Sequence, residues 1–552
     1  MKRSQYNEKR FSDFREIITN SGHKFANLNA FHLKRPDGTY YHITYSQLEQ
    51  MFYGLCGRFI EMGLKGKKIA IMGPNSFQWI LCYMCAATVG VAVPIDKELS
   101  PCDARNLTEI SDCRLFCGED KMAEAFAETS GADIEIIPFS RIEELAQDAT
   151  DSDRFNVDSL EIKKDEMQVL LFTSGTTGSA KGVCLSQHNI CTNVYQTVSI
   201  VKILPTDKTL SVLPVHHTYE CTLDHILMLS RGACISYCES IARFQRNLKE
   251  FSPTLLVVVP ALLKVLDKKV RNGVLEGVPS KYKKYFEELP FAQAMKKMPF
   301  FIKIAIRNKV RKTLGGRLKL FIVGAAALDP ELVENFCALG IRTLQGYGLT
   351  ECAPLLAGNN DFYLNPLSTG VAIPGVDIKI DQPDNEGVGE ILARGENIML
   401  GYFNDPEATE NTFRDGWFCT GDLGYLDDEG GLYITGRKKN VIVTANGKNI
   451  YPEELETRLS AYEQIGEVIV MEGSKNGEPC VKAKIYPNAA AVEAVLGYEP
   501  SLREVKQFVH DAVNEMNNQI PQFKHIKVIE ILEEPLEKTT TQKIKRYGDN
   551  TK

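Results

Sequence analysis

The chain has 552 residues, of which 44% are hydrophobic and 24% charged, a composition typical of globular proteins with several cores. The formal net charge of −7 argues against a protein dedicated to nucleic-acid binding. Residues 1–11 are polar and lack the apolar core of a secretion signal, so we expect a cytoplasmic protein. The longest uncharged apolar run, residues 79–95, contains Gly90 and Pro94 and is too short to span a membrane.

Short runs rich in Val, Ile and Leu alternate with segments of helical length through the first part of the chain. The runs lie at residues 68–73, 91–95, 169–174, 209–214, 255–260 and 318–324. Such alternation is typical of parallel sheets with helices on their faces. The sequence therefore predicts a large N-terminal domain of the α/β class.

The pattern changes after Gly370. Shorter runs at residues 376–381, 389–395 and 431–436 are separated by Asp, Asn and Gly, which favours an antiparallel sheet or a small barrel. Helix and strand signals then begin again, at residues 452–461, 467–472, 480–487 and 527–532. We predict two domains, residues 1–436 and an α+β domain of residues 437–552, with the boundary near Arg437 to Asn440.

The 15 cysteines follow no framework, and most stand beside apolar residues, as reduced thiols do in cytosolic proteins. We therefore expect no disulfides. Cys82 and Cys85 have CxxC spacing, with Cys113 and Cys117 downstream, which a zinc site can have. Since residues 79–87 read as a buried helix, we favour structural thiols over zinc ligands.

Small and hydroxyl-bearing residues fill the segment after the run at 169–174. From Thr173 to Gly182 every residue is Ser, Thr or Gly except Ala180 and Lys181. The backbone N–H groups of such a loop can approach a phosphate closely, and hydroxyls and a lysine add donors. The glycine spacing differs from that of the Walker P-loop. The alternatives are a phosphate-binding loop of another kind and an ordinary surface loop.

Five further segments share their order and spacing with one family: "LPVHHTYE", "QGYGLTE", "GWFCTGDLG", "GRKKNVIVTANGKNIYPEELE" and "KTTTQKIKR". Together with the loop, they make the chain resemble the adenylate-forming acyl-CoA synthetase superfamily. The segments "NKVRKTLGGRLKLFIVGAAAL" and "GYGLTECAP" are most similar to bacterial long-chain fatty acid–CoA ligases. The resemblance implies that ATP converts a fatty acid to an acyl adenylate, and that coenzyme A then displaces AMP.

The resemblance assigns the phosphates of ATP to the loop. Its expected contacts are Thr173, Ser174, Gly175, Thr176, Thr177, Gly178 and Lys181. Mg²⁺ would bind the Thr173 hydroxyl and the Glu351 carboxylate, because this cation prefers a few protein oxygens beside waters and phosphates. Taken alone, the motif around Glu351 could also be a helix-capping box.

The remaining nucleotide contacts also follow from the resemblance. Tyr347 would lie against adenine, with Gly324 and Ala325 beneath the ring. Asp422 would accept the ribose hydroxyls and Arg437 would complete the ribose and phosphate contacts, although an aspartate in such a motif can simply form a turn. Other expected nucleotide contacts in the motif at 345–351 are Gln345, Gly346, Gly348 and Thr350.

Two residues would take part in the chemistry. His217 would lie between the acyl carboxylate and the α-phosphate, and we interpret His216 as incidental; a packing role is the alternative for His217. Lys543 would stabilise the charge that develops during adenylation. Glu537 and Gln542 replace the proline and glycine common in the family, so the segment around Lys543 departs from the family pattern while the position of the lysine is kept.

The resemblance also implies that the C-terminal domain rotates between the two half-reactions. Lys439 stands at the hinge position, where a short backbone rotation can carry a rigid domain. Gly447 would line the channel for pantetheine, where the absence of a side chain leaves room.

Two other functions share these residues. One is acyl transfer to the phosphopantetheine arm of an acyl carrier protein, and the other is nucleotide binding by a regulatory protein without catalysis.

Residues 291–328 carry nine Lys or Arg and no acid, so they could touch an anionic bilayer. We favour a solvated helix face there, because the apolar positions form no single stripe. We thus expect no nucleic-acid partner and at most peripheral membrane contact.

Overall fold

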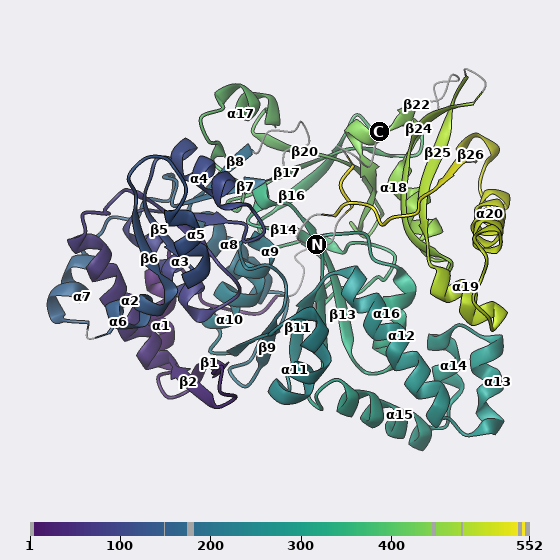
Figure 1. Ribbon diagram of the computed structural model, residues 1–552, viewed down its shortest axis with the longest axis horizontal. Helices are drawn as coiled ribbons and strands as arrows, with labels where there is room; N and C mark the ends of the chain where they lie inside the picture. The colour runs from purple at the N-terminus through teal and green to yellow at the C-terminus, as the bar shows by residue number, and fades with distance from the viewer. Residues whose placement is uncertain are drawn as a thin grey trace. The chain divides into compact units, whose positions relative to one another are not determined.

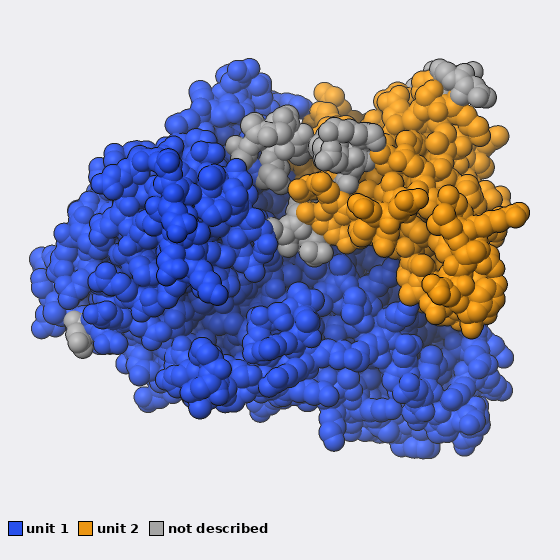
Figure 2. Space-filling model, in the orientation of Figure 1, with its two compact units in different colours: residues 1–377, 394–418 blue, residues 378–393, 419–552 orange. Residues whose placement is uncertain are grey.

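The computed structural model describes residues 5–147, 149–173, 181–443, 449–475, 478–538 and 544–546. The chain forms two compact units (Figure 2). Unit 1 contains residues 1–377 and 394–418, and unit 2 contains residues 378–393 and 419–552. Residues 378–393 and 419–436, which the sequence analysis assigned to the first domain, thus belong to unit 2. A rotation at Lys439 is a separate property and stays a prediction.

The first sheet of unit 1 has the order β18-β8-β7-β4-β3-β5-β6. Its strands are β3 (Lys68–Met72), β4 (Val91–Ile95), β5 (Cys113–Gly118), β6 (Glu135–Pro138), β7 (Val169–Thr173), β8 (Lys181–Leu185) and β18 (Gly401–Tyr402). Neighbours from β7 to β6 are parallel, whereas β8 and β18 are antiparallel to the strands they join. The parallel strands β3 and β4 are almost wholly buried, as expected when helices cover both faces.

The second sheet of unit 1 has the order β15-β14-β13-β12-β11-β9-β10-β1-β2. Its strands are β1 (Asn29–Lys34), β2 (Tyr40–Thr44), β9 (Lys208–Ser211), β10 (Cys234–Tyr237), β11 (Leu255–Val258), β12 (Leu320–Val323), β13 (Arg342–Gly348), β14 (Leu355–Gly358) and β15 (Val371–Ala372). The strands from β13 to β1 pair in parallel, and antiparallel strands close both ends. The carboxyl ends of β12 and β13 therefore meet at one edge.

Helices of the N-terminal part cover the first sheet (Figure 1). They are α1 (Phe14–Lys24), α2 (Tyr45–Glu61), α3 (Phe77–Val89), α4 (Pro101–Ile110), α5 (Asp120–Ala127), α6 (Phe139–Leu145), α7 (Asp151–Asp158) and α8 (Gln187–Val198). The side chain of Ser76 caps α3 by accepting a hydrogen bond from N of Trp79, and every residue of α3 except Gln78 is buried. The predicted buried helix is thus confirmed. All 15 cysteines are free thiols, and those of α3 belong to no candidate metal-binding group among the described residues.

A second set of helices packs on the other sheet. It comprises α9 (Thr218–Glu220), α10 (Leu227–Ser230), α11 (Phe244–Phe251), α12 (Pro260–Gly277), α13 (Ser280–Glu288), α14 (Phe291–Lys297), α15 (Phe300–Thr313) and α16 (Pro330–Ala338). α13, α14 and α15 each begin directly after a proline, at Pro279, Pro290 and Pro299. One continuous core joins α11, α12 and α16 to this sheet and receives Ile306 and Val310 of α15.

Unit 2 begins with a sheet in the order β16-β17-β20, with β21 also paired to β20. Its strands are β16 (Asp377–Asp381), β17 (Gly389–Arg394), β20 (Trp417–Leu426) and β21 (Leu432–Arg437). β20 is antiparallel to β21 and, at its start within unit 1, to β19 (Phe413–Arg414), which follows α17 (Pro406–Thr412). The predicted antiparallel sheet is present, as an open sheet.

The rest of unit 2 is an α+β arrangement. It contains β22 (Ile442–Val443), β23 (Asn449–Ile450), α18 (Pro452–Leu459), β24 (Ile465–Lys475), β25 (Glu478–Pro487), α19 (Ala489–Leu496), α20 (Leu502–Asn518) and β26 (Ile526–Ile531). Ser501 and Glu504 form a capping box at the start of α20, and its apolar face packs on β24 and β25 through Val509 and Val513. The predicted fold class is confirmed. No helix of the described part is long and apolar enough to cross a membrane.

Candidate active site

The ends of the predicted phosphate loop lie side by side in unit 1. Thr173 ends β7, Lys181 begins β8, and the two are register partners in the antiparallel pair. The Thr173 hydroxyl is 3.4 Å from the Lys181 carbonyl oxygen. The residues between them lie outside the described part, but their two anchors place a hydroxyl and an ammonium group at one end of the sheet.

Glu351 is linked to this place through Tyr402. The Tyr402 hydroxyl donates a hydrogen bond of 3.0 Å to Oε1 of Glu351. The Lys181 ammonium lies 4.8 Å from the centroid of the Tyr402 ring, within the range of a cation–π interaction. Tyr402, which the sequence motifs did not indicate, thus links Glu351 to Lys181, and strand pairing joins Lys181 to Thr173.

Strand β18 explains how Tyr402 reaches Glu351. Gly401 and Tyr402 pair with Cys184 and Val183 of β8, so Tyr402 lies along the strand that Lys181 begins. The Met399 backbone N–H donates to the Glu351 carbonyl oxygen at 2.8 Å, which fixes the two segments from the other side. The local signal in the sequence, "GYF" after an apolar run, gives no indication of this partner.

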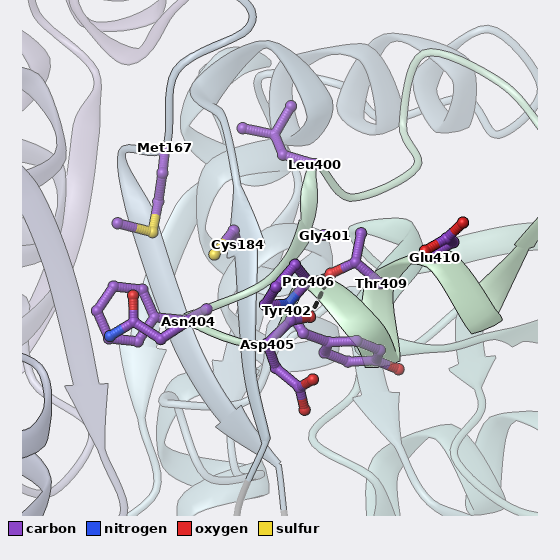
Figure 3. A pocket seen from close by; sticks show the side chains of 11 residues that line it. Met167, Cys184, Leu400, Gly401, Tyr402, Asn404, Asp405, Pro406, Thr409 and Glu410 are labelled. Atoms are coloured by element: carbon purple, nitrogen blue, oxygen red, sulfur yellow. Dashed lines mark hydrogen bonds between the residues drawn. The ribbon is translucent and has the colours of Figure 1, made fainter.

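A cavity of about 590 Å³ adjoins the same segment (Figure 3). Met167, Cys184 and the chain from Leu400 to Pro406 contribute to its lining, together with Thr409 and Glu410. The Thr409 hydroxyl accepts a hydrogen bond of 2.9 Å from the Tyr402 backbone N–H. Because the lining is mostly apolar and its described residues include no Lys or Arg, the cavity does not suit a phosphate.

The predicted adenine contacts meet at the carboxyl edge of the second sheet. Gly324 and Ala325 follow β12, Tyr347 lies near the end of β13, and these strands are parallel neighbours with Val323 opposite Gln345. Ligands of open α/β sheets bind at such an edge. Ala325 has a φ of 71°, a left-handed backbone that turns the chain away after the strand.

Two glycines at this edge are fixed by close approaches. A Cβ on Gly348 would lie 1.8 Å from the carbonyl oxygen of Pro354, so the chain can double back towards Glu351 only with glycine there. A Cβ on Gly324 would meet the ring of Tyr219 at 3.1 Å. Gln345 is buried, Gly346 pairs with Gly358 of β14, and Thr350 begins the short helical turn that carries Glu351.

His217 stands directly before α9 and its ring contacts that of His216, with the centroids 4.2 Å apart. Nε2 of His216 is 3.5 Å from Oδ2 of Asp96, which follows β4. Burial lowers the pKa of His217, and the Asp96 carboxylate opposes this shift. Burial and the neighbouring His217 hold the pKa of His216 well below its ordinary value. His216, which the sequence analysis treated as incidental, is thus part of the surroundings of His217.

A hydrogen-bond network holds the loop before His217. The Asn75 amide donates to the Ser211 hydroxyl at 2.8 Å and to the Leu213 carbonyl at 2.6 Å, and its oxygen accepts from the Val215 backbone N–H at 3.1 Å. The Ser211 hydroxyl donates in turn to Oε1 of Glu220 at 2.6 Å. Sequence reasoning missed Asn75, since it lies in a turn far from the motif that it supports.

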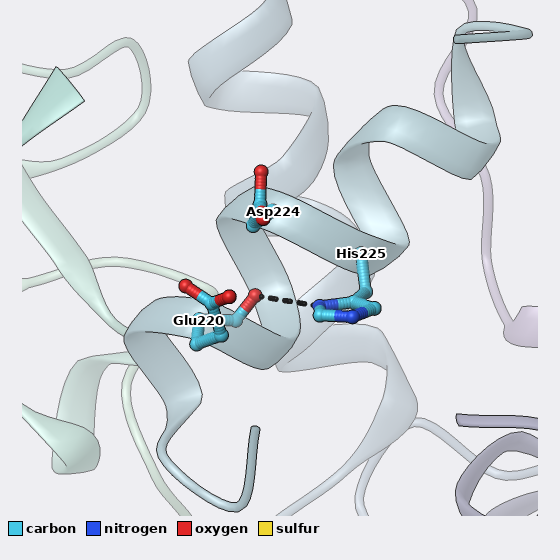
Figure 4. A group of neighbouring side chains, drawn as sticks. All are labelled: Glu220, Asp224 and His225. Carbon is cyan, nitrogen blue, oxygen red and sulfur yellow. Dashed lines mark hydrogen bonds between the residues drawn. The ribbon is translucent and has the colours of Figure 1, made fainter. Parts of the chain in front are cut away.

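Glu220, Asp224 and His225 form a wholly buried group on α9 and the π-helical turn Cys221–Ile226 (Figure 4). The Ser211 hydroxyl donates to Oε1 of Glu220, and the Thr209 hydroxyl donates to Oδ1 of Asp224. Burial raises the pKa of Asp224 to about 7, and burial and Asp224 raise that of Glu220 well above its usual range. Burial lowers the pKa of His225 to about 4.

The ligand atoms of these three residues lie close enough to hold a metal ion. However, Nδ1 of His225 is 3.2 Å from the Glu220 carbonyl oxygen, to which it can donate. Oε2 of Glu220 and Oδ2 of Asp224 have no hydrogen-bond partner in the described part of the chain, and burial raises the pKa of both carboxyl groups. We therefore interpret the group as two carboxyl groups that burial favours in the protonated form, beside a neutral histidine.

In unit 2, the predicted ribose contacts form an ion pair. Asp422 of β20 and Arg437 of β21 are register partners, and Nε of Arg437 is 2.6 Å from Oδ1 of Asp422. Asp422 is 5% exposed and its backbone N–H donates to the Thr420 hydroxyl. Lys439 lies in the short helical turn Lys438–Asn440 that follows β21. The turn interpretation of Asp422 is wrong, because the residue lies within a strand.

Seven predicted site residues lie outside the described part of the chain: Ser174, Gly175, Thr176, Thr177, Gly178, Gly447 and Lys543. The segments that flank Lys543 are nevertheless placed. Lys538 and Ile544 form an antiparallel bridge, and the Lys545 backbone N–H donates to the Glu537 carbonyl at 2.9 Å. An ion pair between Arg546 and Glu456 fixes the outgoing segment.

Comparison with known proteins identifies the family. The model of the family described as AMP-binding enzyme matches residues 19–403. The long-chain-fatty-acid–CoA ligase FadD15 of Mycobacterium bovis is 29% identical over 469 residues, which cover 80% of this chain and 76% of the relative.

Two solved structures share the fold. One is the Mycobacterium tuberculosis fatty acyl CoA synthetase, with 22% identity, a TM-score of 0.66 and coverage of 97% of this chain and 96% of the other. The second is the Bacillus subtilis O-succinylbenzoate coenzyme A synthetase in complex with ATP and a magnesium ion, with 20% identity, a TM-score of 0.71 and coverage of 96% and 98%.

Proposed function

Because the chain belongs to the AMP-binding family of adenylate-forming enzymes, we propose that it joins a long-chain fatty acid to coenzyme A while converting ATP to AMP and pyrophosphate. Family membership confirms the resemblance seen in the sequence motifs and makes the chain an AMP-forming acid–thiol ligase. The identity of the acid is the finer inference. It is supported by relatives such as FadD15, whose name specifies a long-chain fatty acid.

The observation that best supports this function is the cluster of Thr173, Lys181, Tyr402 and Glu351. A hydroxyl and a carboxylate are the hard oxygen donors that Mg²⁺ takes in nucleotide sites, so Thr173 and Glu351 fit this ion. The Lys181 ammonium beside them would offset phosphate charge. In this proposal Tyr402 holds the Glu351 carboxylate in place, and Mg²⁺ supplies charge neutralisation for the departing pyrophosphate.

The adenosine part would be bound by two further sets of residues. Tyr347 offers a flat aromatic face next to the small residues Gly324 and Ala325. The Asp422 carboxylate would accept the ribose hydroxyls, with Arg437 fixing its orientation through their ion pair. We propose the remaining motif residues as backbone contacts to the nucleotide: Ser174, Gly175, Thr176, Thr177, Gly178, Gln345, Gly346, Gly348 and Thr350.

His217 and Lys543 would act at the reacting atoms. Since burial lowers the pKa of His217, its ring is neutral at pH 7 and can donate one hydrogen bond without bringing a charge to the acyl carboxylate. Lys543 would stabilise the charge on the α-phosphate as the carboxylate attacks. For the second half-reaction we propose that the chain after Lys439 rotates and that Gly447 lines the path of the pantetheine thiol.

The test is an assay of pyrophosphate release from ATP with a panel of carboxylates from butyrate to stearate. We expect the longer acids to be the better substrates, AMP to be the nucleotide product, and free coenzyme A to be the acceptor. Stoichiometric ADP would contradict the family chemistry. Thioester formation on the phosphopantetheine arm of a carrier protein, without activity towards free coenzyme A, would show the acceptor to be wrong. Nucleotide binding without turnover of any acid would indicate a regulatory protein.

A further inference from the structure

The turn between α14 and α15 exposes large apolar side chains to solvent. We define the α14–α15 corner as residues 296–304. Within it, Phe300 is 77% exposed, Phe301 is 70% exposed and Ile304 is 40% exposed. Adjacent exposed aromatic residues are uncommon on a monomeric protein and mark surfaces that meet an apolar partner.

The corner is held in a fixed form. Pro299 precedes the first turn of α15, and the Lys303 ammonium donates a hydrogen bond of 2.8 Å to the Lys296 carbonyl oxygen at the end of α14. One face of α15 is anchored, since Ile306 and Val310 are buried in the core of unit 1. The two phenylalanines therefore face solvent, although the helix that carries them is packed on the core through Ile306 and Val310.

All charged side chains of α14 and α15 are basic. Arg307 and Arg311 are used internally, because they donate to the Ala338 and Gly340 carbonyl oxygens near the end of α16, and Lys319 pairs with Asp207. Five lysines of α14 and α15 form no ion pair in the part of the chain that the structure describes: Lys296, Lys297, Lys303, Lys309 and Lys312. Four of them, all but Lys303, are exposed.

The far end of α15 adds a basic hollow. A cavity of about 460 Å³ is lined by Lys249, Lys309, Lys312, Thr313, Gly315 and Gly316. Among the residues that the structure describes, its lining has three lysines and no carboxylate, which suits a phosphate group. Phe300 and Lys312 are twelve residues apart on one helix, or about 18 Å at 1.5 Å per residue. Apolar and basic surfaces thus share one helix.

Although the sequence pattern favours a solvated helix face for residues 291–328, the exposed phenylalanines lead to a different inference: we propose that the α14–α15 corner docks on the surface of an anionic phospholipid bilayer. Phe300 and Phe301 enter the boundary between headgroups and acyl chains, while the lysines and the basic hollow contact lipid phosphates. Charge complementarity favours this occupant over a second copy of the chain, because self-association through this surface would bring lysines against lysines. The proposal is independent of the reaction that the protein catalyses.

The first test measures flotation of the full chain with vesicles of phosphatidylcholine, with and without phosphatidylglycerol. We expect binding to the anionic vesicles and a loss of about tenfold or more in the partition coefficient for the double variant Phe300→Ser, Phe301→Ser. The matched control is Phe155→Ser, since Phe155 is 73% exposed on the acidic helix α7. Equal binding of the double variant and the wild type would overturn the proposal, as would absence of binding to anionic vesicles.

The second test reverses charge. Lys296→Glu, Lys297→Glu should weaken binding to anionic vesicles by about tenfold or more, and salt should weaken binding of the wild type. Lys65→Glu, Lys67→Glu is the control, because these lysines are exposed elsewhere on unit 1. If both double variants lost vesicle binding equally, binding would not be specific to the α14–α15 corner. Light scattering without vesicles tests for a dimer that dissociates when Phe300 and Phe301 are replaced, which would assign the corner to self-association instead. Unchanged urea midpoints exclude misfolding as the cause of any loss.

Discussion

Tyr402 donates its phenolic hydrogen to Oε1 of Glu351, a residue 51 positions earlier in the chain, over 3.0 Å. Burial and the Glu351 carboxylate raise the pKa of Tyr402, so the phenol stays protonated and remains a donor at any pH the enzyme meets. The carboxylate proposed to hold Mg²⁺ is therefore oriented by a neutral group.

Replacing Tyr402 by Phe should weaken the use of Mg-ATP. A hydrogen bond to a charged group contributes about 1.5–3 kcal/mol, so we expect KM for Mg-ATP to rise by about tenfold or more. KM for the acid should change little. Tyr40→Phe is the matched control, since the Tyr40 hydroxyl also donates to a carboxylate, that of Glu250. If the two variants had the same KM for Mg-ATP, Tyr402 would have no role in orienting the Glu351 carboxylate.

Glu351→Gln tests the same contact from the other side. Loss of the carboxylate charge should impair Mg-ATP use in the first half-reaction, because phosphate repulsion is then uncompensated. If Tyr402 acts through Glu351, adding Tyr402→Phe to this variant should cost much less than it costs in the wild type. Additive effects in the double-mutant cycle would show that the two residues act separately. Near-normal adenylation by Glu351→Gln would remove Glu351 from the metal site.

Asn75→Ala should disturb the loop that ends at His217. The variant loses two donated hydrogen bonds and one accepted bond, so water should reach the histidine. Because burial lowers the pKa of His217, we expect this pKa to rise towards its ordinary value, as followed by NMR titration of the imidazole. Adenylation should fall by about tenfold or more. The exposed Asn156→Ala is the control, and an unchanged His217 titration would contradict the positioning role.

Lys543→Ala should separate the two half-reactions. Removal of one group that stabilises developing charge costs about a hundredfold or more, and this loss should appear in formation of the acyl adenylate. The variant should still convert preformed acyl adenylate to acyl-CoA. Lys545→Ala provides the control, since Lys545 lies two residues on, beside Glu537. Equal slowing of both steps would contradict a rotation that removes Lys543 before coenzyme A attacks.

Asp224→Asn should change how stability depends on pH. In the folded state the pKa of Asp224 is raised from 3.8 to about 7, so its contribution to stability is present at low pH and is lost as pH rises through about 7. The variant cannot ionise at this position. The thermal midpoint of the variant minus that of the wild type should therefore increase by about 2–4 °C or more when the pH is raised from about 5 to about 8. A constant difference across this range would show that Asp224 does not titrate.

Much of the fold could be predicted because its signals are local. The run at residues 91–95 predicts a strand, and β4 has these bounds, although Pro94 stands in its interior. β4 accommodates the proline because its pairing with β7 is confined to Ala92. The motifs likewise indicated Thr173, Lys181 and Glu351 from their residue types and spacing.

Contacts set by distant pairing could not be predicted. Tyr402 reaches Glu351 only because Gly401 pairs with Cys184, and nothing in either local sequence specifies that register. Asn75 supports a loop that begins well over a hundred residues later. Asp224 stands in an apolar segment, but the local sequence does not show that its side chain is buried beside Glu220. That burial depends on the packing of the whole unit. The roles of Gly447 and Lys543 stay predictions.

The chain enters unit 2 at residue 378, returns to unit 1 at residue 394, and leaves it again after residue 418. During synthesis on the ribosome, β16 and β17 therefore emerge before β20, which lies next to β17 in their sheet. The first sheet of unit 1 likewise waits for β18 to complete its edge beside β8. While residues 378–402 are being translated, the nascent chain carries two unfinished sheets with unpaired edges. A translational pause in this stretch would be the most hazardous for aggregation.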